Sequence, residues 1–268
     1  MAVVYDTLIL SDVHLGSEVS RAEQATRMLK ENRFRRLILL GDIFSDLNFR
    51  RLTKEHWKFL GYIRKLSNPK RGVEVVWVEG NHDQGLVDVM SHLVGVKAYQ
   101  EYCWDFLGRR HIAIHGHQFD RFVVNNFLLS NLGSFLHLQL QKLDFKGKCF
   151  SRYLDRLHIR WLRLTQKVAS GALAYARFHQ AERVFCGHTH VAVREERDGI
   201  EYYNSGSWTD ARPTYVTVDA EGVQIHEYHE RTDDRDSGEE RSPADSEFVD
   251  FADEAGLLED AEYEGVGR

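Results

Sequence analysis

Short apolar runs alternate with segments of helical spacing along the first third of this chain, and few folds accommodate that order. Residues 7–10, 37–40 and 73–78 are apolar runs of strand length, whereas residues 21–32 and 53–66 carry apolar side chains at helical spacing. Such alternation is typical of a largely parallel sheet whose strands are joined by helical crossovers. We therefore predict an α/β fold.

The pattern changes in the second half. Residues 121–178 are helical in character, and the strand pattern resumes at 183–186 with hairpin-like segments whose turns are Asp198-Gly199 and Glu221-Gly222. We expect more antiparallel pairing here. We therefore divide the chain into three parts. Residues 1–121 and 179–230 form the main domain, residues 122–178 form a helical insertion, and residues 231–268 form a C-terminal tail.

The tail carries most of the acidity of the chain. From residue 231 onward there are 14 Asp or Glu against 4 Arg. Residues 1–230 contain 31 Lys or Arg against 27 Asp or Glu, so they are slightly basic although the whole chain has a net charge of −6. With few large apolar side chains, the tail cannot bury enough surface to offset its ordering entropy. We predict that it is disordered, with docking on a partner as the alternative.

Polar clusters stand just past the C-terminal ends of several predicted strands. They are Asp12-Val13-His14, Gly41-Asp42, Gly80-Asn81-His82-Asp83, His115-Gly116-His117 and Gly187-His188-Thr189-His190. Loops beyond the carboxyl ends of strands converge in open α/β sheets, so residues far apart in sequence can meet there. Asp, His and Asn suit divalent metals, and the neighbouring glycines allow sharp turns. Together the clusters predict one metal site.

This ordered signature resembles the calcineurin-like metallophosphoesterases over residues 7 to about 228. The resemblance implies a four-layer α/β/β/α metallophosphoesterase sandwich with two divalent metal ions at the sheet edge. It also implies hydrolysis of a phosphorus–oxygen bond by a metal-bound hydroxide. Manganese is the expected metal; iron, zinc and cobalt stay open because affinity order does not decide occupancy.

By the same resemblance, ligands can be assigned to each metal. The first metal would be held by Asp12, His14, Asp42 and His190, and the second by Asp42, Asn81, His115 and His188. Asp42 would bridge them. A single carboxylate has two oxygens, so it can hold two cations at the spacing of roughly 3.5 to 4 Å that two-metal phosphate chemistry requires.

His82 is the candidate general acid that protonates the leaving oxygen, and Asp83 is expected to orient its imidazole or raise its pKa. The alternative is that His82 stands near the metals without a chemical role. His117 is not assigned as a ligand. The turn Asn204-Ser205-Gly206-Ser207 resembles the closing turn of the family and is expected to support the metal loops.

Basic residues dominate the helical insertion. Residues 121–178 contain 10 Lys or Arg against Asp144 and Asp155, and Arg152, Arg156 and Arg160 are candidate substrate-binding residues on a predicted basic helix face. Two interpretations stay open. The helices either pack on the main domain with solvated arginines, or they form a lid over the metal site.

The lid interpretation follows a further resemblance, carried by the helical insertion and by residues 115–120, His-Gly-His-Gln-Phe-Asp. These are similar to UDP-2,3-diacylglucosamine hydrolases, which split a pyrophosphate in a lipid-A precursor under an apolar lid. The lipid-A enzyme commonly has Arg at the position of His82. A different substrate, anionic and apolar at once, therefore also fits.

Two other function classes compete with a lipid pyrophosphatase. A nucleic-acid or soluble-nucleotide phosphodiesterase would share the metal site, but nucleic acid is not favoured because the chain as a whole is acidic. A non-catalytic binding module would be expected to have lost ligands, and all seven are present. With no signal-like N-terminus and no apolar run of roughly 18 residues, we expect a cytoplasmic protein with a phosphorylated small-molecule or lipid substrate. Peripheral contact with the cytoplasmic face of an anionic membrane is part of the same expectation.

Overall fold

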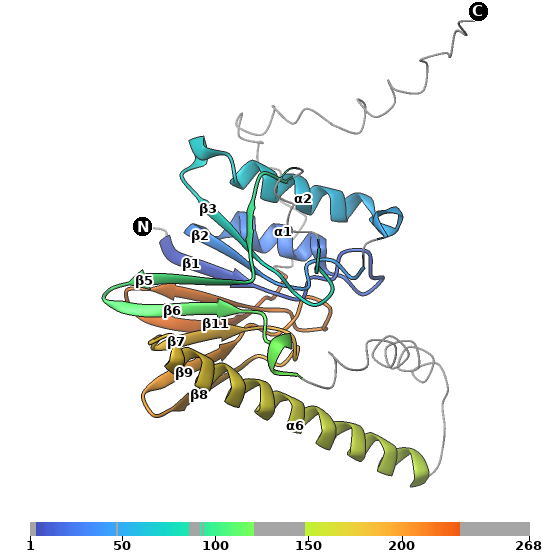
Figure 1. Ribbon diagram of the computed structural model, residues 1–268. Coiled ribbons are helices and arrows are strands. Elements are labelled where there is room, and N and C mark those ends of the chain that lie inside the picture. The colour runs from blue at the N-terminus through green and yellow to red at the C-terminus, as the bar shows by residue number, and fades with distance from the viewer. Residues whose placement is uncertain (1–3, 47, 86–91, 93, 121–147, 231–268) are drawn as a thin grey trace, which may run out of the picture. The chain divides into compact units, whose positions relative to one another are not determined.

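A computed structural model of the chain describes residues 4–46, 48–85, 92, 94–120 and 148–230, with the backbone alone at 148–161 (Figure 1). Within these residues the strands form two sheets, of six and five strands. None of the described helices is long and apolar enough to cross a membrane.

The first sheet follows the predicted alternation of strand and helix. Strands β1 to β4 are parallel and lie side by side, and β10 and β11 extend the sheet antiparallel from β1, giving the order β11-β10-β1-β2-β3-β4. The strands span Val4–Leu10 (β1), Arg33–Leu40 (β2), Glu74–Val78 (β3), Lys97–Tyr99 (β4), Thr214–Asp219 (β10) and Gly222–Glu227 (β11). The crossover helices are α1 (Ala22–Glu31) and α2 (Lys54–Leu66), and the 3₁₀ turns η1 (Phe49–Arg51) and η2 (Pro69–Arg71) flank α2.

The second sheet mixes parallel and antiparallel pairs, as predicted for the second half. Its order is β5-β6-β7-β9-β8, in which β6, β7 and β9 are parallel and the two edge strands are antiparallel. The strands span Glu101–Phe106 (β5), Arg109–Ile114 (β6), Arg183–Cys186 (β7), Val193–Arg197 (β8) and Ile200–Asn204 (β9). A 3₁₀ turn, η3 (His117–Phe119), follows β6, and helix α6 (Lys148–Phe178) precedes β7.

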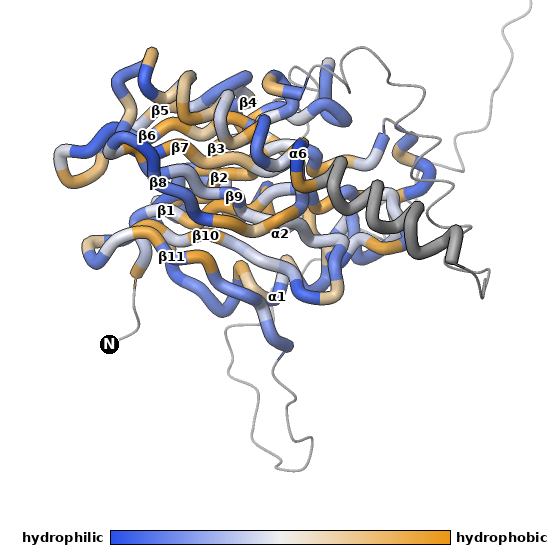
Figure 2. Tube along the Cα trace, turned by 90° about the horizontal axis from the view of Figure 1, so that it is seen from below, coloured by the Kyte–Doolittle hydropathy of each residue, from blue (hydrophilic) through white to orange (hydrophobic). Residues whose placement is uncertain are grey.

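Three apolar cores join the layers. Alternate side chains of β2 point to opposite faces, so Leu39 packs toward α1 and α2 while Ile38 packs between the two sheets. The third core lies between the second sheet and α6, where Ala172 packs with Val184. Hydrophobic stretches gather in the strands of both sheets (Figure 2). The predicted four-layer α/β/β/α sandwich is confirmed.

Helix α6 forms the outer layer on the second sheet. Val168, Ala169, Ala172, Leu173 and Ala176 are buried, and all but Val168 belong to the core that this helix shares with the second sheet. The end of the predicted insertion, at residue 178, is therefore part of the sandwich. Residues 122–147 of the predicted lid and the predicted disordered tail, 231–268, lie outside the described residues.

The strand ends place all five predicted motifs at one edge, because β1, β2 and β3 are parallel within one sheet and β6 and β7 within the other. The backbone N–H of Asp12 donates to Gly41 O (3.0 Å), and that of Gly187 donates to His115 O (3.0 Å), which aligns the loops within each sheet. The backbone N–H of His188 donates to Asp12 Oδ2 (3.1 Å) and joins the loops of the two sheets.

Candidate metal centre

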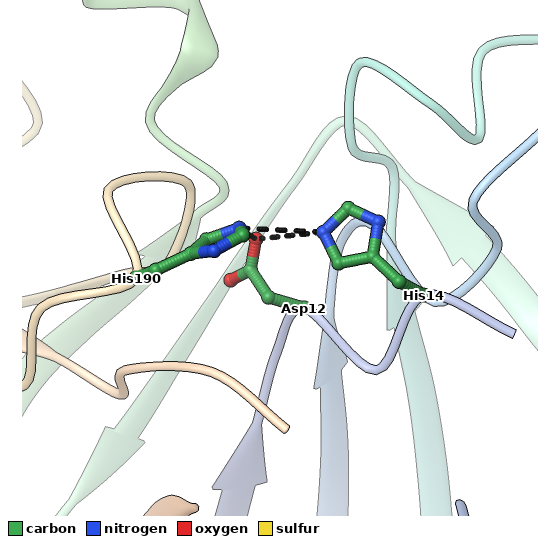
Figure 3. Close-up of side chains that lie close together, drawn as sticks. All are labelled: Asp12, His14 and His190. Atoms are coloured by element: carbon green, nitrogen blue, oxygen red, sulfur yellow. Dashed lines mark hydrogen bonds and ion pairs between the residues drawn. The ribbon is translucent and has the colours of Figure 1, made fainter. Parts of the chain in front are cut away.

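Two groups of side chains among the residues that the structure describes could hold a metal ion, and Asp12, His14 and His190 form the first (Figure 3). Asp12 Oδ1 lies 3.1 Å from His190 Nε2 and 3.8 Å from His14 Nε2, and the two Nε2 atoms are 3.3 Å apart. The rings point toward each other from loops that follow β1 and β7 (Figure 3). One oxygen and two imidazole nitrogens are a ligand set suited to divalent transition metals.

Asp42, His115 and His188 form the second group; Asp42 and His115 are buried, and the His188 side chain is nearly so. Asp42 Oδ2 lies 3.3 Å from His115 Nε2. The other ring nitrogen of His115, Nδ1, donates to Leu40 O (2.8 Å), so Nε2 is the nitrogen that faces Asp42 and could hold a cation. Within each group the ligand-capable atoms lie within 4.8 Å of one another.

The buried charges shift one another's pKa values. Burial alone would lower the pKa of His115, but Asp42 outweighs it and raises that pKa to about 9. Burial would likewise raise the pKa of Asp42, yet the surrounding imidazoles, chiefly His115, hold it well below its ordinary value. Burial dominates at His14 and lowers its pKa to about 4. Asp42 is therefore ionised and His14 neutral at pH 7, the forms that metal coordination requires.

Three buried polar atoms at these groups test whether a cation fits there. Asp12 Oδ1, Asn81 Oδ1 and His115 Nε2 make no well-oriented hydrogen bond within the described residues. Buried polar atoms in native proteins nearly always have a partner, and an ion is one accepted explanation for an exception. All three atoms belong to predicted ligands, so the residues present fit a pair of divalent cations.

The backbone is strained at the same positions. Asp12, His14, Asp42, His188 and His190 all have positive φ, between 50° and 67°. This left-handed region is unfavourable for residues other than glycine and is enriched at functional sites, where the surrounding fold holds it in place. The sandwich therefore fixes five predicted ligands in conformations that they would not adopt alone.

Glycines let the loops approach the ligand side chains. A Cβ at Gly80 would overlap the backbone nitrogen and Oδ1 of Asp42, and one at Gly187 would overlap Asp12 Oδ2. A Cβ at Gly41 would overlap the ring of His115. These contacts explain why three of the five motifs begin with glycine.

Replacing Gly80 with alanine is expected to destabilise the protein by about 1–3 kcal/mol, the usual range for overpacking, and to lower its metal content. Gly61→Ala is the matched control, because that site lies within α2 with no atom in contact range. It should leave metal content unchanged and add up to about 1 kcal/mol of stability. Urea unfolding and metal analysis measure both, and a Gly80→Ala protein with wild-type values would contradict the tight packing.

The ring of His82 lies beside the first group, 5.2 Å from the ring of His14. Its Nδ1 is 2.7 Å from Ser45 O, and its backbone N–H donates to Asp42 Oδ1 (2.9 Å). Ser45 therefore orients the imidazole by accepting from Nδ1. Nε2 is then the ring nitrogen that is not turned to Ser45.

The Asp83 carboxylate bonds to the backbone of a neighbouring loop, and Ser45 instead orients the His82 ring. Its two carboxylate oxygens accept from the backbone N–H groups of Ile43 (3.0 Å) and Phe44 (2.9 Å), so it holds the loop after Asp42 and leaves the His82 ring to Ser45. Burial raises the pKa of Asp83 to about 7, and the neighbouring charge of Asp42 adds to the shift.

The turn after β9 supports the metal loops, as predicted. Asn204 Nδ2 donates to Gly187 O (2.6 Å), which holds the loop of His188 and His190. Ser205 Oγ donates to Ser11 Oγ (2.8 Å), and the backbone N–H of Trp208 donates to Asp12 O (3.1 Å). The turn therefore braces both loops that supply the first group.

Two buried residues beside the second group received no role from the sequence. His117 belongs to neither group, and its Nε2 lies 3.3 Å from Gln84 Nε2. Burial lowers the pKa of His117 to about 3, and the nearby His115 and His188 contribute. Asp120 Oδ2 lies 3.5 Å from His188 Nε2. Asp120 closes the quoted stretch 115–120, but only the fold brings it to His188.

The candidate substrate-binding residues Arg152, Arg156 and Arg160 fall on α6, and their side chains lie outside the described residues. Farther along the helix, Arg163 and Lys167 are exposed. Val168 sits against the loop of the fourth motif, since a Cβ at Gly116 would lie 3.1 Å from it. Helix α6 therefore passes next to the site.

Comparison with known proteins is consistent with this geometry. The calcineurin-like phosphoesterase superfamily domain matches residues 6–223. The comparison with curated proteins finds no match. Among solved structures, an archaeal phosphodiesterase is 15% identical over 83% of this chain and 99% of its own, with a TM-score of 0.44.

Two further solved structures show similar values. The Escherichia coli phosphoesterase Yfce is 16% identical over 81% of this chain and 90% of its own, with a TM-score of 0.44. Wild-type Vps29 from Entamoeba histolytica, complexed with Zn²⁺, is 14% identical over 83% of this chain and 97% of its own, with a TM-score of 0.40. At TM-scores below 0.5, these similarities establish no shared activity.

Proposed function

Because this chain belongs to the calcineurin-like phosphoesterase superfamily, we propose that it hydrolyses a phosphoester or pyrophosphate bond with two divalent cations, and that its substrate is an amphipathic, nucleotide-linked lipid. The observation that carries the hydrolase proposal is the pair of adjacent carboxylate–imidazole groups at one strand edge. Manganese is the proposed metal, on the mixed nitrogen and oxygen ligands.

The side chains divide the work of holding the cations. Asp12, His14 and His190 would hold one, and Asp42, His115 and His188 the other, with the amide oxygen of Asn81 as a further ligand. When bound, the two cations would neutralise phosphate charge and activate water. Asp42 suits the bridging position, because its charge acts on both His14 and His115.

His82 would serve the leaving group. With Nδ1 engaged by Ser45 O, a proton on Nε2 can pass to the departing oxygen, which otherwise leaves as a costly alkoxide. The backbone N–H of His82 also donates to Asp42, so the same residue fixes the carboxylate on which both cations would depend.

The substrate class is proposed from the segment beside the site. Residues 121–178 carry 10 Lys or Arg against 2 Asp, and α6 runs past the carboxyl ends of the strands (Figure 1). Leu162 and Arg163 on this helix are both exposed, which offers apolar and cationic contact side by side. A lipid-linked diphosphate would use both kinds of contact. At the surface of an anionic membrane, each Lys or Arg would add about 1 kcal/mol to membrane binding.

Kinetics test the two levels of this proposal separately. If the protein is a metal-dependent hydrolase, we expect it to cleave an aryl phosphodiester only when Mn²⁺ is added, and we expect EDTA to stop the reaction. For the lipid substrate, kcat/KM should rise with acyl-chain length, since each buried methylene contributes about 0.8 kcal/mol. Metal-independent activity, or none on any phosphoester, would contradict the hydrolase proposal.

Charge-reversal variants locate the substrate contact. Arg156→Glu with Arg160→Glu should weaken the chain-length preference while leaving the aryl substrate unaffected. Arg33→Glu with Arg35→Glu, two exposed sites on β2 at the opposite end of the strands, is the control. Faster cleavage of soluble nucleotides or single-stranded nucleic acid, without chain-length dependence, would favour the phosphodiesterase alternative.

A further inference from the structure

Each of three imidazoles at the centre has one nitrogen near a fixed acceptor. His115 Nδ1 donates to Leu40 O (2.8 Å), and His82 Nδ1 lies 2.7 Å from Ser45 O. At His188 the acceptor is a carboxylate, since Nε2 lies 3.5 Å from Asp120 Oδ2. One ring nitrogen of a metal-binding histidine commonly donates to such a partner, which fixes the tautomer and the ring orientation.

The turn that carries Asp120 is held firmly. The backbone N–H of Asp120 donates to His117 O (3.0 Å), and the backbone N–H of Phe119 donates to Gly116 O (3.1 Å). The ring of Phe119 sits against Gly171 of α6 so closely that a Cβ there would lie 2.7 Å from it. Helix α6 therefore clamps the turn, and Asp120 is buried with 1% of its surface exposed.

A buried carboxylate needs a compensating donor or charge, because an unpaired one is costly to remove from water. His188 Nε2 is such a partner for Asp120, and it is also nearly buried. With Nε2 turned to Asp120, Nδ1 is the nitrogen left for a cation beside Asp42 and His115. Asp120 itself is in neither of the two metal-binding groups.

We propose that Asp120 is a positioning residue for the metal centre: it accepts from His188 Nε2 and so presents His188 Nδ1 to the cation shared with Asp42 and His115. The inference rests on the proposed two-metal function. A carboxylate partner also raises the basicity of the ring, and removing such a partner lowers metal affinity by about 10- to 100-fold in other metal sites.

Metal binding without substrate tests this role. Titration calorimetry with Mn²⁺ should give two sites in the wild-type protein, and Asp120→Ala should weaken one of them about 10- to 100-fold. Asp120→Asn keeps an acceptor oxygen at the same place and should recover part of the loss. Asp105→Ala, at an exposed aspartate of β5, should match the wild type.

A spectroscopic measurement separates positioning from a general structural role. Long-range ¹H–¹⁵N spectra of the Zn²⁺-loaded protein, with His188→Gln for assignment, should show His188 protonated at Nε2. Metal affinities unchanged in folded Asp120→Ala, or a His188 ring protonated at Nδ1, would overturn the inference alone. A wild-type protein that binds fewer than two cations would instead contradict the proposed function on which it rests.

Discussion

Asp42→Ala is expected to abolish hydrolysis and to lower the bound metal at both sites together. The Asp42 carboxylate accepts from the His82 backbone, lies 3.3 Å from His115 Nε2, and is buried at the strand edge. Its removal would take a ligand from both cations and leave His115 without its counter-charge. Several kcal/mol of charge stabilisation correspond to a rate loss of more than about a thousand-fold.

Metal analysis and hydrolysis of an aryl phosphodiester measure both effects in one preparation. Asp46→Ala is the matched control, because Asp46 belongs to the same loop but pairs with Arg51 at the surface. Asp42→Asn guards against a folding defect, since the amide keeps the shape and can still accept from His82. An active Asp42→Ala protein with two bound metals would refute the bridging assignment.

The ligand clusters could be predicted because their position follows from strand order. Parallel strands bring their carboxyl ends to one edge, so short runs such as Asp12-Val13-His14 and Gly41-Asp42 meet whatever the details of packing. Periodicity also placed α1 and α2 within a residue or two of their observed bounds. These inferences depend on local sequence and on topology alone.

Roles that depend on contacts between distant residues could not be predicted. Asp83 is adjacent to His82 in sequence, which suggested that it orients that ring, yet its partners are Ile43 and Phe44, some 40 positions earlier. Asp120 meets His188 across a separation of 68 positions. Neither pairing leaves a periodic or spacing signal in the chain.

The packing of α6 on the second sheet has no clear signal in the sequence, for a related reason. The charges of residues 121–178 drew attention to a basic face, whereas the contact with the second sheet is made by small residues. Ala169, Ala172 and Ala176 allow α6 to lie close to the sheet, and Gly171 admits the ring of Phe119. Small side chains contribute little to an apolar stripe, so composition did not reveal which end of the helix belongs to the sandwich.

His82→Ala is expected to lower the rate by about 100- to 10,000-fold while leaving both cations bound, the usual range for loss of a general acid. The side chain is held by Ser45 O and lies beside His14 without being in either metal-binding group. Its backbone N–H, which donates to Asp42, survives the substitution. The centre should therefore keep its metals and lose only the proton donor.

The loss should shrink as the leaving group improves, because a nitrophenolate departs without protonation whereas an alkoxide does not. A series of nitrophenyl, phenyl and alkyl esters measured with wild type and His82→Ala gives the two slopes to compare. His179→Ala, just past the C-terminal end of α6, controls for loss of an imidazole elsewhere. A steeper dependence on leaving-group pKa in His82→Ala would establish proton donation. An equal loss across the series, or one that tracks metal content, would assign His82 to binding or to metal positioning instead.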